Sequence, residues 1–190
     1  TGFRVELVAA EPLVQDPVMM TFDERGRIWV AELPAYNFEL LSATPAYLDR
    51  NAPAPPRPVG RVVILEDTDG DGRADRRTVY ADNLDVPRAI AFVGHKVLIG
   101  DPPNLWLTRD RDGDGVMDEK VLIASDYGTA DNIEQSANGL LWGRDNWLYN
   151  ANYKSRMRLG GGEWQREPMP ALGQWGITQD DFGRLFYNTN

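Results

Sequence analysis

Residues 61–81 read RVVILEDTDGDGRADRRTVYA, and they carry the clearest structural signal in the chain. Two runs rich in apolar and β-branched residues flank a loop that has aspartate at positions 67, 69, 71 and 75. The runs have the composition of strands, and the aspartates and glycines have that of a turn. The same plan returns 43 residues further on, from Asp67 to Asp110. We therefore expect two copies of one strand–loop–strand unit.

Short runs with period two continue along the chain, and no long amphipathic helix interrupts them. Repeats of roughly 40 to 50 residues with four strands each are typical of β-propellers. We therefore predict an all-β fold, a partial β-propeller of about three and a half four-stranded blades. The predicted blades cover approximately residues 18–81, 88–124, 138–168 and 174–190.

A proline-rich insertion, residues 34–60, interrupts the first predicted blade. Such a long irregular loop is usually either functional or flexible. A closed propeller needs about four to eight blades, which is more than this chain supplies. We expect it to be the N-terminal piece of a longer protein, with fragment pairing or self-association as the alternative.

The composition excludes several kinds of chemistry. The 190 residues contain no cysteine, which excludes disulfides, thiolate metal sites and covalent c-type haem attachment within this chain. The single histidine, His95, excludes a three-histidine zinc site. The net charge of -9 argues against nucleic-acid binding. No run of 18 apolar residues exists, so we expect no membrane span in this chain.

The two aspartate loops share the pattern D-x-D-x-D-G-x-x-D, which predicts two calcium ions. Ca²⁺ takes about six to eight oxygen ligands, and carboxylates at alternate loop positions converge on one point when the backbone coils. An EF-hand needs glutamate at position 12, where this chain has Thr78 and Val121. We therefore expect the shorter calcium hairpin, with structural ions; a solvated acidic turn without metal is the alternative. The predicted ligands are Asp67, Asp69, Asp71, Arg73 and Asp75 for one ion and Asp110, Asp112, Asp114, Val116 and Asp118 for the other, with Arg73 and Val116 acting through their backbone carbonyls.

A ligand pocket is expected on the opposite face of the blades. Connections between strands one and two and between strands three and four lie on one face, and those between strands two and three and between blades lie on the other. The aspartate loops and tight turns belong to the first face, and the polar irregular segments belong to the second. The pocket candidates are Arg88, Glu134, Gln135 and Asn138. Each has a structural alternative, such as an ion pair between blades for Arg88 or backbone hydrogen bonds for Asn138.

Five stretches carry a family resemblance, namely residues 2–12, 16–17, 22–32, 60–72 and 138–151. They resemble the N-terminal propeller of the membrane-bound dehydrogenase-like family of planctomycetes and verrucomicrobia. The resemblance implies a secreted or periplasmic protein. It also implies a c-type haem domain elsewhere in the longer protein as a partner in electron transfer.

The predicted fold is similar to that of the soluble glucose/sorbosone dehydrogenases, which use calcium and the quinone cofactor PQQ and take a histidine as general base. Gln135 stands at the comparable position here, and glutamine cannot abstract a proton. Two hypotheses therefore stay open. One is a sugar- or alcohol-oxidising dehydrogenase, and the other is a non-catalytic, calcium-stabilised module that binds carbohydrate, another small molecule or protein.

Overall fold

The computed structural model describes residues 2–34, 60–129 and 133–188, and this part of the chain is built almost entirely from antiparallel strands. Its one helix is a single 3₁₀ turn, η1 (Ile133–Gln135). No helix of the described residues has the length and apolar character needed to cross a membrane. The all-β prediction is confirmed, while the proline-rich insertion predicted at 34–60 lies largely outside the described residues.

The strands form three four-stranded sheets and one hairpin, each from consecutive strands in chain order. The first sheet contains β1 (Pro17–Phe22), β2 (Ile28–Glu32), β3 (Gly60–Glu66) and β4 (Arg76–Leu84). The second contains β5 (Ala89–Val93), β6 (Lys96–Asp101), β7 (Asn104–Arg109) and β8 (Glu119–Ala124). The third contains β9 (Asn138–Trp142), β10 (Leu148–Ala151), β11 (Ser155–Gly160) and β12 (Glu163–Pro168), and the hairpin pairs β13 (Ile177–Gln179) with β14 (Leu185–Tyr187).

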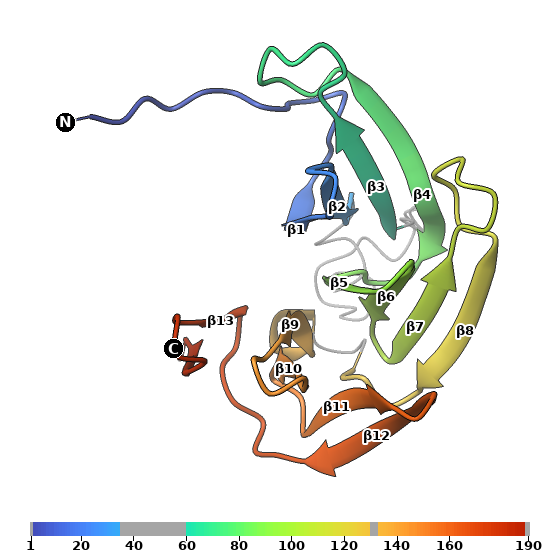
Figure 1. The fold of residues 1–190 in the computed structure, drawn as a ribbon, viewed down its shortest axis with the longest axis vertical. Coiled ribbons are helices and arrows are strands. Elements are labelled where there is room, and N and C mark those ends of the chain that lie inside the picture. The colour runs from blue at the N-terminus through green and yellow to red at the C-terminus, as the bar shows by residue number, and fades with distance from the viewer. Residues whose placement is uncertain (1, 35–59, 130–132, 189–190) are drawn as a thin grey trace, which may run out of the picture.

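The sheets follow one another along an arc around a common centre (Figure 1). In each four-stranded sheet the first strand, β1, β5 or β9, lies innermost, and the last, β4, β8 or β12, lies at the rim (Figure 1). The innermost strands of neighbouring sheets contact one another. This radial arrangement of antiparallel blades confirms the prediction of a partial β-propeller.

The core lies between the sheets rather than at the centre of the arc. One buried cluster joins the first and second sheets, and Trp29, Ile64 and Ile99 belong to it. A second cluster joins the second and third sheets, and Leu98 and Leu148 belong to it. Because each sheet has neighbours on its faces, alternate residues of the inner strands are buried on both sides, and the sheets are held face to face by apolar burial.

Hydrogen bonds fix how one sheet meets the next. The Trp142 indole N–H donates to the Phe92 carbonyl at 2.9 Å, which connects the third sheet to the second. The Tyr80 hydroxyl on β4 and the Thr108 hydroxyl on β7 lie 2.9 Å apart and both are buried. The first contact joins the innermost strands β9 and β5, and the second sets the relative position of the outer strands β4 and β7, next to which the aspartate loops begin.

An aspartate stabilises the tight turn in two of the hairpins. Asp23 Oδ1 accepts the backbone N–H groups of Arg25 and Arg27, both at 2.9 Å. In the β13–β14 turn Asp180 Oδ1 accepts those of Phe182 and Arg184, both at 2.9 Å. The aspartate that begins the turn therefore has the same physical role in both hairpins, because its side chain satisfies turn amides that have no strand partner.

Candidate metal centre

The two aspartate loops occupy equivalent positions in neighbouring sheets. The first connects β3 to β4 and the second connects β7 to β8, so both join the two outer strands of a sheet. The glycines at the sixth loop position, Gly72 and Gly115, have φ values of +89° and +86°. A residue with a Cβ is strained in this conformation, and glycine therefore permits the sharp turn of each loop.

The two loops have almost the same hydrogen-bond pattern. The first aspartate, Asp67 or Asp110, accepts the N–H groups of the two glycines at positions 4 and 6, at distances of 2.7 to 2.9 Å. The aspartates at positions 3 and 5 each accept the N–H two residues further on, as in Arg73 N to Asp71 Oδ1 and Val116 N to Asp114 Oδ1, both at 2.8 Å. Two loops with different intervening residues thus adopt one conformation.

The ninth-position aspartate closes each loop from the other end. Asp75 Oδ2 accepts the Thr68 N–H at 3.2 Å, and Asp118 Oδ2 accepts the Arg111 N–H at 2.7 Å. The Thr68 hydroxyl adds a second contact to Asp75 at 2.8 Å. The carboxylates at both ends of each loop are therefore held in place by the loop backbone.

Carboxylate oxygens converge in both loops. Those of Asp67, Asp69 and Asp71 lie within 4.8 Å of one another, and so do those of Asp110, Asp112 and Asp118. Of the predicted carboxylate ligands, Asp75 and Asp114 fall outside these tightest groups, although both belong to the hydrogen-bonded loops. The hydrogen bond from the Gly72 N–H is the main cause that holds the pKa of Asp67 below its ordinary value, and other loop N–H groups add to it. The Asp67 carboxylate therefore stays charged. Three charged oxygens this close suit a hard cation such as Ca²⁺.

Each loop is also anchored to the chain that precedes its sheet. The Met117 N–H of the second loop donates to the Tyr80 carbonyl on β4 at 2.8 Å. At the same loop position, the Ala74 N–H of the first loop donates to the Val8 carbonyl at 2.8 Å. The N-terminal segment thus contacts the first loop in the same way as β4 contacts the second loop. The conformation of each loop is therefore coupled to its packing against that preceding segment.

The predicted pocket residues on the opposite face have structural contacts. Asn138 is buried; its Nδ2 donates to the Ser136 and Gln174 carbonyls at 3.0 and 2.8 Å, and its Oδ1 accepts the Gly176 N–H at 2.7 Å. These bonds connect β9 to the segment that leads into β13. Asn138 therefore fits the structural alternative that the sequence left open.

The other three pocket candidates differ in their exposure. The Arg88 side chain is buried, with its guanidinium carbon 4.4 Å from the centre of the Trp175 ring. Glu134 and Gln135 are exposed on η1, and the Gln135 carbonyl accepts a hydrogen bond from Asn152 Nδ2. Residues 35–59 and 130–132, which the sequence predicts for this face, lie outside the described residues, so the pocket stays a prediction.

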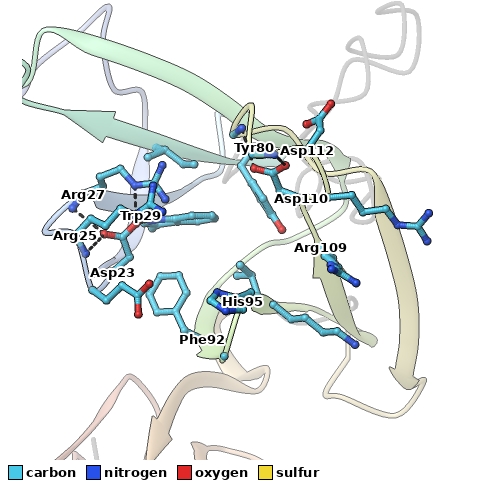
Figure 2. Close-up of a pocket in the computed structure, with 18 residues that line it drawn as sticks. Asp23, Arg25, Arg27, Trp29, Tyr80, Phe92, His95, Arg109, Asp110 and Asp112 are labelled. Atoms are coloured by element: carbon cyan, nitrogen blue, oxygen red, sulfur yellow. Dashed lines mark hydrogen bonds and ion pairs between the residues drawn. The ribbon is translucent and has the colours of Figure 1, made fainter.

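A cleft that the sequence did not predict lies on the same face as the tight turns. It has a volume of about 690 Å³ and is lined by the β1–β2 turn, the β5–β6 turn and the second aspartate loop (Figure 2). Asp110 and Asp112 therefore belong both to the candidate metal centre and to the wall of this cleft. No local sequence signal indicates the cleft, because its walls come from three turns that are far apart in the chain.

The fold and these loops define a partial β-propeller with two equivalent acidic loops between its outer strands. The chain belongs to the family described as a domain of unknown function, DUF7133, whose model matches residues 1–190. No match was found among curated proteins.

Solved structures show the same fold. A gluconolactonase from Xanthomonas campestris is 18% identical with a TM-score of 0.58, and the match covers 97% of this chain and 58% of that one. A structural-genomics target described as a presumed gluconolactonase is 13% identical with a TM-score of 0.55, covering 94% and 57% of the two chains. This chain thus spans less than two thirds of the length of these neighbours, and at such identities the likeness concerns the fold alone.

Proposed function

We propose that this chain is a calcium-binding propeller segment of a secreted or periplasmic protein, in which two Ca²⁺ ions stabilise the outer strands of neighbouring blades. The observation that carries the proposal is the shared conformation of the two loops. In both, backbone N–H groups orient the aspartates so that three carboxylates come within 4.8 Å of one another. Close carboxylates repel one another, and a bound divalent cation removes that cost.

The proposed ligands follow the loop positions. Asp67, Asp69 and Asp71 would hold one ion, completed by the Arg73 carbonyl and Asp75. Asp110, Asp112 and Asp118 would hold the other, completed by Asp114 and the Val116 carbonyl. Because Met117 donates to the Tyr80 carbonyl on the neighbouring sheet, an ion in the second loop would also stabilise the packing between the first two sheets.

Calcium titration and thermal unfolding test this proposal. A ligand at a hundred times its dissociation constant stabilises the folded state by about 2.7 kcal/mol, which corresponds to roughly 5–10 °C in a chain of this size. We expect isothermal titration calorimetry to find two Ca²⁺ per chain, and Asp69→Asn or Asp112→Asn each to reduce this number to one. Magnesium is the control, because it prefers a tighter octahedral shell. Equal melting temperatures in calcium and in chelator would refute the proposal.

A sugar- or alcohol-oxidising role, with PQQ as cofactor and a c-type haem domain as electron acceptor, is the function that the family resemblance implies. The described pocket candidates do not favour it, because Asn138 is held by three backbone hydrogen bonds and Gln135 cannot act as a base. We therefore propose that this segment binds a carbohydrate or a related small molecule.

The same purified chain tests the enzymatic alternatives. Dye reduction with PQQ, Ca²⁺ and a panel of sugars and alcohols tests the oxidation, and hydrolysis of sugar lactones tests the activity named for the neighbours of similar fold. Turnover by the purified chain in either assay would replace the binding role by a catalytic one.

A further inference from the structure

The cleft between the first two sheets has an aromatic floor. The Trp29 ring lies 4.6 Å from that of Tyr80 and 5.3 Å from that of Phe92, measured between centroids, in edge-to-face packing. The Trp29 indole N–H donates to Asp23 Oδ2 at 3.0 Å, and the Tyr80 hydroxyl is hydrogen-bonded to Thr108 at 2.9 Å. The floor is therefore fixed before any ligand binds, which lowers the entropic cost of binding.

The charges around this floor have the opposite balance to the chain as a whole. The chain carries a net charge of -9, yet five arginines and lysines and only four aspartates and glutamates line the cleft. Asp23 is already neutralised by Arg27, whose Nε lies 2.7 Å from Asp23 Oδ2. Two more of the acids, Asp110 and Asp112, belong to the second aspartate loop, which leaves Glu24 as the remaining acid.

Three cationic side chains lie at the rim of the cleft without an acidic partner in the described residues. Arg25, Lys96 and Arg109 are exposed, and none of them forms an ion pair within the part of the chain that the structure describes. Their positive charges would attract a negative group in the cleft.

Figure 2 shows how these groups are arranged. Asp23, Arg25 and Arg27 lie on one side, Arg109 and Asp110 lie on the other, and the rings of Trp29, Phe92 and His95 lie between them. Trp29 and Tyr80 are buried, and Phe92 is the partly exposed ring of this floor. A half-buried ring between charged rims suits a ring-shaped organic anion, because the ligand ring packs on Phe92 while its negative groups reach the cations. The volume of about 690 Å³ falls within the usual range of ligand sites and exceeds the size of one small ion.

We propose that this cleft binds an anionic saccharide, with the C–H faces of its rings against Phe92 and its carboxylate or sulfate groups near Arg25, Lys96 and Arg109. The site goes beyond the proposed calcium role, but one consequence rests on that role. A Ca²⁺ ion in the second loop would neutralise Asp110 and Asp112 beside the cleft, so saccharide affinity should be higher in calcium than in chelator.

Calorimetric titration with tri-galacturonate and with a sulfated trisaccharide tests the proposal, with maltotriose as the neutral saccharide and sodium sulfate as the inorganic anion. We expect at least one charged trisaccharide to bind, more weakly as salt is raised. Replacing both Lys96 and Arg109 by glutamine should weaken binding about tenfold, because it removes two exposed ion pairs that are each weak in water. Arg144→Gln, an exposed cation in the β9–β10 turn outside the cleft, is the matched control and should leave the affinity unchanged.

Several outcomes would overturn the proposal. The proposal fails if neither charged trisaccharide binds, or if maltotriose binds equally well. It also fails if sulfate binds equally well, which would indicate an adventitious ion only. Full affinity in the Lys96→Gln/Arg109→Gln variant would overturn it too. Calcium titration of the same variant separates the two proposals, because neither substituted side chain is a predicted calcium ligand. Calcium binding without saccharide binding refutes this inference alone, and saccharide binding without calcium binding refutes the calcium role alone.

Discussion

Asp101→Asn should make the stability of the folded protein less dependent on pH. Asp101 ends β6 and is 2% exposed, and its Oδ1 accepts the Val86 N–H at 2.6 Å. Burial raises the pKa of Asp101 from 3.8 to about 6, although the Val86 hydrogen bond acts in the other direction. The folded protein therefore holds a proton on Asp101 that the unfolded chain releases. This contribution to stability is fully present below about pH 4 and is lost as the pH rises through about 6.

The magnitude follows from the difference in pKa. About two units at roughly 1.4 kcal/mol each correspond to about 3 kcal/mol between acid and neutral pH. Asparagine keeps the acceptor for Val86 and cannot ionise. The variant should match the parent near pH 4 and exceed its stability near pH 8 by up to this amount.

Urea unfolding between about pH 4 and pH 8, at fixed calcium concentration, measures the free energies of both proteins. Asp181→Asn, a change at an exposed aspartate in the β13–β14 turn, is the control for the loss of one surface charge. If the difference between Asp101→Asn and the parent stays constant across this range, burial does not perturb Asp101 and the reasoning fails.

Two further predictions concern packing. Glu32 is fully buried, and Arg61 Nε and Arg77 Nη2 each lie 2.9 Å from its Oε2. Glu32→Gln should therefore reduce the free energy of unfolding in urea by about 3 kcal/mol, and a loss below about 1 kcal/mol would contradict this. At Gly100 an added Cβ would lie 2.5 Å from the Tyr127 ring, so Gly100→Ala should cost about 1–3 kcal/mol in thermal unfolding. Gly2→Ala, where nothing lies within 4 Å, is its control, and equal melting temperatures of the two variants would show that the ring moves aside freely.

The fold was predictable because its hydrogen-bond topology is local. Every four-stranded sheet has the order of the chain, so each strand pairs with the next strand in sequence. Period-two patterns and turn residues therefore carry most of the pairing information, and the turn aspartates Asp23 and Asp180 even make the same bonds in two hairpins. The N-terminal segment is different, because its contact from Val8 to Ala74 joins residues far apart in the chain and no motif predicts it.

The candidate metal centre was predictable for the same reason. The hydrogen bonds that the aspartate side chains of the first loop accept all come from residues between Asp67 and Asp75, so nine consecutive residues specify most of its conformation. Its coupling to neighbouring chain through Ala74 depends on tertiary structure and needed coordinates. Asn138 illustrates the opposite case, since its partners Gln174 and Gly176 lie 36 and 38 residues later, and only the structure distinguishes a blade connector from a pocket residue.

The position of Asp110 changes how the two loops should be interpreted. The sequence makes the loops equivalent and gives both ions a structural role, with any ligand on the opposite face. In the structure only the second loop borders the cleft, because Asp110 and Asp112 lie beside the β1–β2 and β5–β6 turns. A cation there would stabilise a strand connection and also set the charge of a neighbouring cavity. Substitutions in the two loops should therefore have different effects. Those in the first loop should change stability alone, and those in the second should change both stability and anion binding.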